Sequence, residues 1–413
     1  MKERGLLAGV FKKGESERYI ERRMDELNKL AGTAGIDVFE SIVQRRDEID
    51  PAYYMGRGKV EEIRQLAVEY RIDVIVVSVS LDPVQLRNLE EQTGTRIIDR
   101  NELILIIFSK NARTNVSKVE AELAQYRYLL PRLTGRGIEM SRTGGGIGTR
   151  GPGEKKLETD RRKIRHQIDI LKRKLSKYKS DHKQQRKNRS SVFNVSLVGY
   201  TNAGKTTLMN ALTGNDFNVA DQLFTTLDTT TRKLRKDIVI TDTVGLLGEL
   251  PHELISSFQL TLSEAADAQL QLIVADISSP YCEEQIEEVT STLCELEDEN
   301  NKPERIFVFN KTDMLISDSQ KEYYANRFDR SVFVSAKENR NIDTLFNMIL
   351  DRFLSRFNNI KITVKNEHYR IINFILNNAY IKKQEVRENS IYFDCYLNSR
   401  NHSKLLKMKK EAE

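Results

Sequence analysis

Residues 192–207 read VFNVSLVGYTNAGKTT, and this stretch decides the fold class of the second half of the chain. The apolar run at 192–198 predicts a buried strand, and Leu208 and Leu212 at helical spacing predict a helix after the glycine-rich turn. The pattern G-x-x-x-x-G-K-T between a strand and a helix is typical of a loop whose backbone N–H groups wrap phosphates. The expected loop residues are Gly199, Tyr200, Thr201, Asn202, Ala203, Gly204, Lys205, Thr206 and Thr207.

Four later segments follow in the order that a nucleoside-triphosphate site requires. Residues 223–232 (LFTTLDTTTR) stand where a switch would offer a threonine to Mg²⁺, and a strand at 238–241 ends in D-x-x-G. Two further strand-like runs end in N-K-x-D at 310–313 and in S-A-K at 335–337. The candidate residues in these segments are Phe224, Thr225, Thr226, Asp242, Thr243, Val244, Gly245, Asn310, Lys311, Asp313, Ser335, Ala336 and Lys337.

Each type of residue has a chemical task in this pattern. Lys205 would reach the β- and γ-phosphates, and the expected Mg²⁺ ligands are Thr206, Thr226 and Asp242, the last through water. The Gly245 N–H would sense the γ-phosphate. Asp313 would accept hydrogen bonds from N1–H and N2–H of guanine, and adenine has neither donor there.

The remaining base contacts follow from the same motifs. Asn310 would brace the loops and contact the base, Lys311 would lie over the ring, and the Ala336 N–H would meet O6. The five elements together predict a GTP-binding domain with a doubly wound sheet and the ligand at the carboxyl ends of its strands.

The catalytic residue is not evident from the sequence. The position after the D-x-x-G glycine, where a glutamine can orient the attacking water, is Leu246. Two interpretations stay open: hydrolysis is slow until a partner supplies or orders the missing group, or the protein is a GTP-gated binder. Thr226 and Gly245 then serve as γ-phosphate sensors.

The rest of the chain is organised around this domain. Residues 1–112 alternate strand-like runs (6–11, 38–43, 74–79 and 96–98) with helix-like runs (15–31, 58–71, 82–93 and 101–112), which predicts a small parallel α/β domain. Two apolar seams at 119–130 and 157–178 predict a helical hairpin over 113–190 that carries a Gly/Arg-rich loop. A disordered linker is the alternative for that loop. The GTPase domain spans 191–357. Residues 358–413 contain strand-like runs at 360–364 and 391–396 and a helix-like run at 367–380, which predicts a small C-terminal α/β domain.

Charge indicates a partner for the hairpin. The chain has 413 residues and a net charge of +6, but residues 150–189 hold sixteen Lys/Arg against five Asp/Glu. A polyanion is therefore expected at this segment, with a solvated helix face as the alternative. Three cysteines without a C-x-x-C pair and the lack of a long apolar run favour a cytosolic protein without an integral membrane segment.

The sequence resembles the HflX family of ribosome-associated GTPases. GGGIGTRGPGEKKLETDRR at 144–162 is similar to the glycine-rich signature of that family, and YYMGRGKVEEI, QLRNLE and AELAQYRYLLPRL are similar to its N-terminal domain. By the family's F-A-T-L-D pattern the switch threonine maps to Thr226, with Thr225 in place of alanine. Departures occur at Gly248, where arginine is usual, and at Asn115 and Glu120.

The resemblance implies GTP hydrolysis stimulated by the ribosome, binding of the large ribosomal subunit and its rRNA, and splitting or rescue of stalled ribosomes. We expect a monomer without a DNA partner, and a role in the stress response. The alternative is a GTP-switched RNA- or ribosome-binding factor without significant catalysis. The departures suggest a diverged paralogue of the type that rescues antibiotic-stalled ribosomes.

Overall fold

A computed structural model describes residues 3–133, 152–188, 192–214, 230–243, 245, 265–296, 303–314 and 317–412. Side chains at 152–157, 182–188, 411 and 412 are not described. The chain forms two compact units, Met1–Asn339 and Arg340–Glu413. The predicted multidomain α/β architecture is confirmed, while the domain boundaries at 113, 191 and 358 stay predictions.

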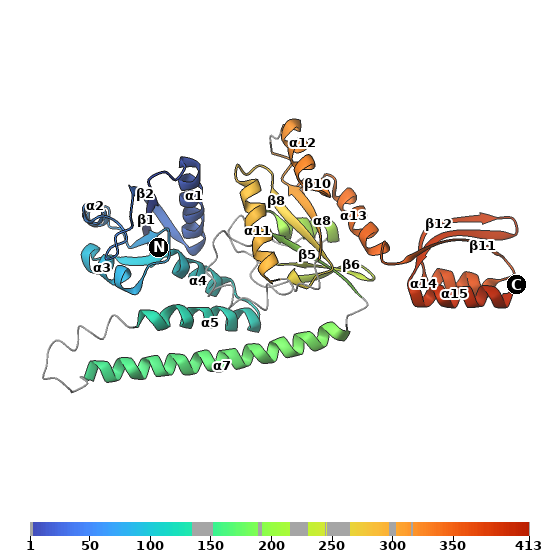
Figure 1. Cartoon of the computed structure of the whole chain (residues 1–413), viewed down its shortest axis with the longest axis horizontal. Helices are drawn as coiled ribbons and strands as arrows, with labels where there is room; N and C mark the ends of the chain where they lie inside the picture. The colour runs from blue at the N-terminus through green and yellow to red at the C-terminus, as the bar shows by residue number, and fades with distance from the viewer. Residues whose placement is uncertain are drawn as a thin grey trace. The chain divides into compact units, whose positions relative to one another are not determined.

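The N-terminal part of the first unit is a four-stranded parallel sheet with the order β2-β1-β3-β4 (Figure 1). Strands and helices alternate along the chain as the sequence predicts. They are β1 (Glu3–Lys12), α1 (Glu17–Ala34), β2 (Ile36–Arg46), α2 (Arg57–Glu69), β3 (Val74–Val77), α3 (Pro83–Thr93), β4 (Arg96–Asp99) and α4 (Arg100–Asn111).

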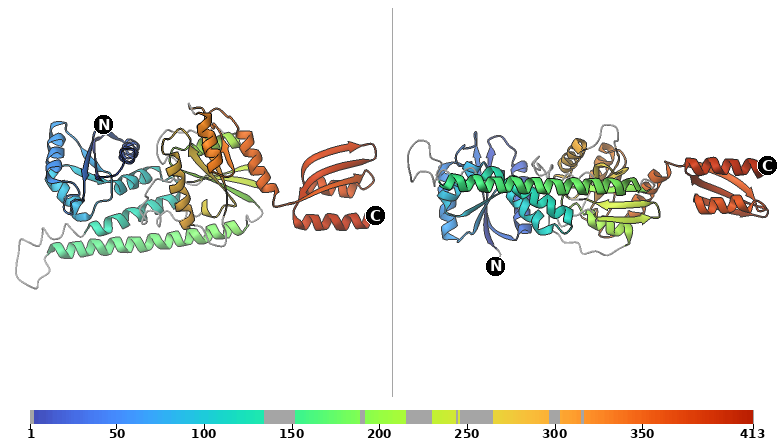
Figure 2. Two further views of the ribbon diagram at one scale, coloured as in Figure 1. Left: turned by 45° about the horizontal axis from the view of Figure 1, so that its top comes forward. Right: turned by 90° about the horizontal axis from the view of Figure 1, so that it is seen from below.

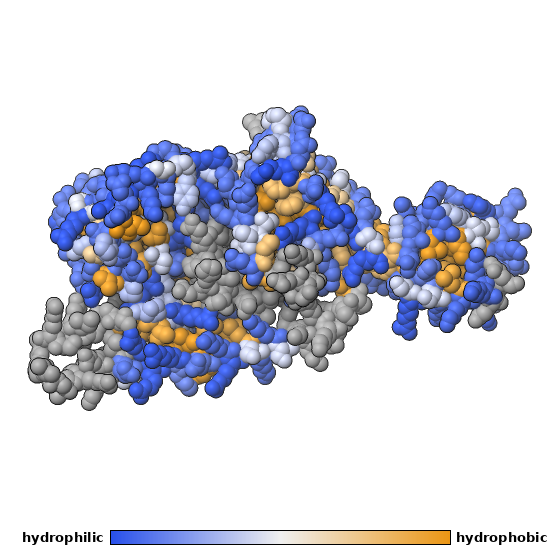
Figure 3. Space-filling model, in the orientation of Figure 1, coloured by the Kyte–Doolittle hydropathy of each residue, from blue (hydrophilic) through white to orange (hydrophobic). Residues whose placement is uncertain are grey.

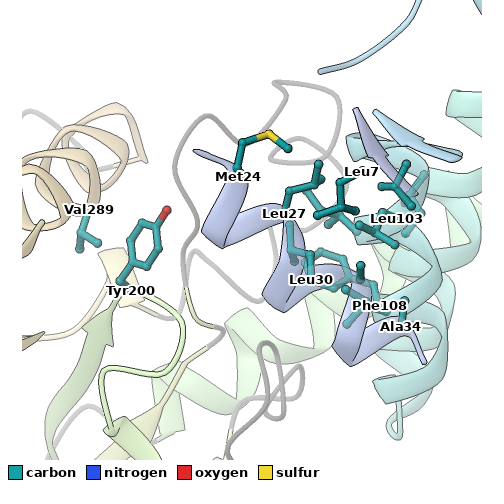
Figure 4. Close-up of a cluster of buried hydrophobic side chains, with 14 of the residues drawn as sticks. Leu7, Met24, Leu27, Leu30, Ala34, Leu103, Phe108, Tyr200 and Val289 are labelled. Carbon is teal, nitrogen blue, oxygen red and sulfur yellow. The ribbon is translucent and has the colours of Figure 1, made fainter. Parts of the chain in front are cut away.

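Alternate residues of β1 serve two apolar clusters, one on each face of this sheet. Leu7 and Phe11 pack with α1 and α4, whereas Leu6, Ala8 and Val10 pack with α2 and α3. Figure 4 shows the first cluster, in which Leu27 and Leu30 of α1 lie against β1 and α4. Burial on both faces explains why β3 consists only of valine and isoleucine.

The two predicted apolar seams meet in a helical hairpin. Helices α5 (Asn115–Arg132) and α7 (Pro152–Asn188) lie side by side (Figure 2). Apolar side chains fill the line between them, which is visible as orange patches in Figure 3. The buried centre of the seam is Leu123, Ile168, Leu171 and Leu175. Leu157 and most of the Gly/Arg-rich loop lie outside the residues whose side chains are described.

A six-stranded mixed sheet follows, with the order β10-β9-β8-β5-β7-β6 and only β6 antiparallel to its neighbour. Its elements are β5 (Phe193–Gly199), α8 (Lys205–Thr213), β6 (Thr230–Arg235), β7 (Ile238–Asp242), β8 (Leu270–Asp276), α11 (Cys282–Leu296), β9 (Glu304–Asn310), α12 (Asp318–Arg327) and β10 (Ser331–Phe333). The central strand β5 is buried from Val195 to Gly199, so its carboxyl end is a fixed platform.

The second unit contains α13 (Ile342–Leu354) and a three-stranded antiparallel sheet with the order β11-β13-β12. Its other elements are β11 (Asn358–Lys365), α14 (Tyr369–Asn378), β12 (Tyr380–Arg387), β13 (Ser390–Leu397) and α15 (Ser399–Ala412). Helices α14 and α15 cover one face of this sheet (Figure 1). The sequence analysis predicted β11, α14 and β13 but not β12 or α15.

Candidate nucleotide site

The phosphate loop connects β5 to α8 in the geometry that the motif requires. Gly204 adopts φ +89° directly before the helix, and Asn202 is also left-handed at φ 63°. A Cβ at Gly199 would lie 2.2 Å from the Val274 carbonyl oxygen, so only glycine permits this approach of β5 to β8. These conformations turn the backbone around the position of a phosphate at the start of a helix.

Lys205 is buried beneath the loop that it serves. Its Nζ donates to the carbonyl oxygens of Gly199 at 3.1 Å and Tyr200 at 2.9 Å. Burial lowers the pKa of Lys205 to about 8, although the charge of Asp242 acts in the opposite direction. A phosphate at this loop would stabilise the charged ammonium because it adds negative charge next to it.

Thr206 and Asp242 meet at the ends of α8 and β7. The Thr206 hydroxyl donates to Asp242 Oδ2 at 2.6 Å, whereas Asp242 Oδ1 is buried without a hydrogen-bond partner in the described part of the chain. Burial raises the pKa of Asp242, and Lys205 and the Thr206 hydroxyl oppose this shift. A hydroxyl and a carboxylate with an unsatisfied oxygen are the oxygen ligands that Mg²⁺ prefers, so these residues fit the ion.

The D-x-x-G glycine lies against the phosphate loop. A Cβ at Gly245 would approach Thr201 Cγ2 to 2.8 Å and Lys205 Nζ to 3.1 Å. The structure therefore brings this segment to the phosphate end of the site, as its predicted role requires. Thr243, two residues earlier, is anchored by a hydrogen bond from its hydroxyl to the Leu197 carbonyl at 2.7 Å.

Asn310 joins the phosphate loop to the S-A-K segment. Its Nδ2 donates to the Ala203 carbonyl at 3.0 Å, and its Oδ1 accepts the Ala336 N–H at 3.0 Å. The expected role as a brace is thus present in the structure. The contacts of Asn310 and Ala336 with a base stay predictions.

The other two residues of N-K-x-D are held by neighbouring strand ends. Asp313 Oδ1 accepts the Ser335 hydroxyl at 2.6 Å, and Lys311 Nζ forms an ion pair with Asp276 Oδ2 at 2.7 Å. Ser335 is fully buried, so it fixes one oxygen of the carboxylate. Ala336 is also buried and Lys337 is exposed.

Several predicted residues lie outside the part of the chain that the structure describes. They are Phe224, Thr225, Thr226, Val244 and Leu246. The switch threonine, its place among the Mg²⁺ ligands and the residue after D-x-x-G therefore remain sequence-based predictions. Thr207 lies in the first turn of α8.

The sequence analysis missed a polar connection between the phosphate loop and the N-terminal sheet domain. The Tyr200 hydroxyl donates to Glu26 Oε2 at 2.5 Å, and the other oxygen of Glu26 accepts Arg100 Nη2 at 2.5 Å. All three side chains are buried. Beside them, Arg22 of α1 pairs with Glu288 of α11 at 2.5 Å. Burial acts to lower the pKa of Arg22, but Glu288 and Tyr200 outweigh it and raise this pKa.

A cavity of about 430 Å³ adjoins this connection. It is lined by α1, by Tyr200, Thr201 and Asn202 of the phosphate loop, and by the segment that follows β8. The sequence carries no local signal for it, because its walls come from three segments far apart in the chain.

The fold and the five motif segments define a P-loop GTPase. Three family models match the chain: "GTP-binding GTPase N-terminal" over residues 21–109, "GTP-binding GTPase Middle Region" over 111–189 and "50S ribosome-binding GTPase" over 194–311. The chain belongs to the HflX GTPase family, as its resemblance implied, and it hydrolyses GTP.

Similar proteins span bacteria and archaea. GTPase HflX of Caldanaerobacter subterraneus subsp. tengcongensis is 38% identical over 396 residues, which cover 94% of this chain and 90% of that protein. GTPase HflX of Escherichia coli is 39% identical, with 80% and 78% covered. GTPase HflX of Methanocaldococcus jannaschii is 35% identical, with 96% and 98% covered.

A solved GTP-binding protein from Sulfolobus solfataricus, in complex with GDP, aligns at 20% identity and a TM-score of 0.46, covering 85% of this chain and 98% of that chain. Among the described residues, no helix is both long and apolar enough to cross a membrane.

Proposed function

We propose that this chain is a ribosome-coupled GTPase that binds the large ribosomal subunit, is stimulated by it to hydrolyse GTP, and splits or rescues stalled ribosomes in the cytosol. The observation that carries the proposal is that the motif segments meet in one site at the carboxyl ends of the strands. Asn310 joins two of them, the phosphate loop and the S-A-K segment. The match of residues 194–311 to a model described as a 50S ribosome-binding GTPase supports the choice of partner.

In this proposal the ends of the site have separate tasks. Asp313 selects guanine, and its Ser335 hydrogen bond orients the carboxylate. Lys205 and the loop N–H groups hold the phosphates. Thr206 and Asp242 would hold Mg²⁺, which when bound supplies positive charge at the phosphate oxygens. Gly245 lies against Thr201, and its N–H group would sense the γ-phosphate.

Helix α7 supplies the RNA-facing surface of this proposal. Its apolar seam is turned toward α5, while cations such as Arg165, Lys172, Arg173 and Lys177 are exposed. Exposed cations in a row bind the phosphates of RNA with a strong dependence on salt. The residue after the D-x-x-G glycine is the apolar Leu246, which cannot orient water, so this proposal makes hydrolysis slow until the ribosome supplies or orders the missing group.

Phosphate release from GTP tests the proposal, measured alone, with purified small subunits and with purified large subunits. We expect stimulation by large subunits only. A double variant, Lys172→Ala with Arg173→Ala, should weaken subunit binding at unchanged GTP affinity. The matched control removes two exposed cations elsewhere, Lys12→Ala with Arg64→Ala. Binding without any stimulation would refute ribosome-coupled hydrolysis, and no binding would refute the large subunit as the partner.

A further inference from the structure

The second unit presents a sheet face opposite to the one that α14 and α15 cover. Along β13, Ile391, Phe393, Cys395 and Leu397 pack toward α14 and α15. Because side chains alternate across a strand, Tyr392 and Asp394 point to the opposite face, which we call the open face. The strand register places Lys361 and Lys383 on either side of Asp394.

Cations outnumber anions on this face and in the unit that carries it. Lys361, Lys383 and Arg387 are exposed, and Glu385 on the same face pairs with Lys383 at 2.5 Å and with Arg387 at 3.3 Å. Residues 340–413 hold fourteen Lys/Arg against eight Asp/Glu, so this unit has a net charge of +6. This positive charge complements a polyanionic partner and does not suit a basic or an apolar one.

An aromatic ring and an unsatisfied acceptor lie among these cations. The Arg387 guanidinium lies 5.4 Å from the centroid of the Tyr392 ring. Asp394 Oδ1 is buried and has no hydrogen-bond partner within the residues that the structure describes. Tyr392 occupies the central strand, opposite Thr363 on one side and Glu385 on the other, so the ring is reached from the open face.

We propose that the open face binds unpaired RNA, with a base stacked on Tyr392 and the phosphates on Lys361, Lys383 and Arg387. Bases stack on aromatic side chains of a sheet only where they are not paired in a duplex. This surface belongs to the second unit, whereas α7 belongs to the first, and its function requires neither nucleotide nor hydrolysis.

Fluorescence anisotropy of the full chain with a labelled twelve-nucleotide oligo(A) RNA tests the inference. We expect Tyr392→Ala to weaken binding at least fivefold, whereas Tyr392→Phe, which keeps the ring, stays within twofold of the unmodified chain. Lys361→Ala with Lys383→Ala should weaken binding at least fivefold and reduce the salt dependence. The matched control, Arg400→Ala with Lys407→Ala, removes two exposed cations from α15 on the covered side.

The outcomes separate this inference from the proposed function. Equal losses of RNA affinity in the Lys361/Lys383 and Arg400/Lys407 double variants would show diffuse electrostatic attraction. Unchanged binding in Tyr392→Ala would show that no base stacks on this ring. Either result overturns the inference. Equal affinity for a duplex of the same length would also overturn it. A misfolded Tyr392→Ala, detected by circular dichroism, leaves the two charge-pair variants to decide. Ribosome-stimulated hydrolysis is measured independently, so its failure does not affect this result.

Discussion

The side-chain amide of Asn310 donates to the Ala203 carbonyl at 3.0 Å, across 107 residues of sequence. This bond fastens the carboxyl end of β9 to the phosphate loop. Because the same amide accepts the Ala336 N–H, three loops share one buried side chain. Asn310 therefore holds the predicted base-binding and phosphate-binding ends of the site together in the structure without a nucleotide.

Replacement of Asn310 by alanine should weaken GDP binding by about tenfold to a hundredfold. Each buried group left without its partner costs ~1–3 kcal/mol. Isothermal calorimetry measures the effect. The control is Asn28→Ala, at an exposed position of α1, which should leave the affinity unchanged. Equal affinities in Asn310→Ala and the unmodified chain would show that the brace is unimportant for binding.

Asp242→Asn tests the Mg²⁺ site. The change keeps the size of the side chain and its hydrogen bond with Thr206, but it removes the charge beside the unsatisfied Oδ1. We expect GTP affinity without Mg²⁺ to change little and the increase in affinity on adding Mg²⁺ to disappear. The measurement is a GTP titration at several Mg²⁺ concentrations. A full Mg²⁺ response in the variant would place the ion elsewhere.

Gly199→Ala and Gly32→Ala form a matched pair for stability. The new Cβ at Gly199 would be 2.2 Å from backbone, so the strands must separate at a cost of ~1–3 kcal/mol. At Gly32 a Cβ meets nothing within 4 Å, and alanine in a helix stabilises by ~0.5–1 kcal/mol. In urea unfolding, the free energy of unfolding should therefore fall in Gly199→Ala and rise in Gly32→Ala. A shared sign would contradict the close approach of β5 and β8.

Tyr200→Phe tests the connection between the phosphate loop and α1. The change removes a hydroxyl that donates to the buried Glu26, and we expect a loss of ~1–3 kcal/mol in the free energy of unfolding. Tyr323→Phe is the control, because its hydroxyl binds Glu283 at an exposed position and should contribute less than ~1 kcal/mol. Similar losses for both variants would indicate that the contact is not buried in solution.

How much of the fold the sequence could predict depended on burial. Strands β1, β3 and β4 of the N-terminal sheet are buried runs between turn residues, and the hairpin seam repeats at helical spacing, so these elements were predicted correctly. Strand β12 was missed because its residues are largely exposed at the edge of its sheet, which erases the alternation that marks a strand.

The candidate site was predicted to a similar extent. Phosphate-loop and N-K-x-D residues stand in motifs whose spacing follows from their chemistry, and the structure brings them together. Glu26 was missed because it meets Tyr200 across 174 residues, and neither residue belongs to a local pattern that links the two segments. Such contacts depend on how two domains pack, which periodicity along one segment does not encode.

The central claim is that Asp313 selects guanine at the site whose phosphate end is Lys205. The most direct measurement is calorimetric titration of the unmodified chain and of Asp313→Asn with GDP and with xanthosine diphosphate, which carries an oxygen where guanine carries its 2-amino group. An asparagine can donate to that oxygen, so we expect Asp313→Asn to bind GDP at least tenfold more weakly and xanthosine diphosphate more tightly than the unmodified chain does. Unchanged preference for GDP in Asp313→Asn would contradict the account.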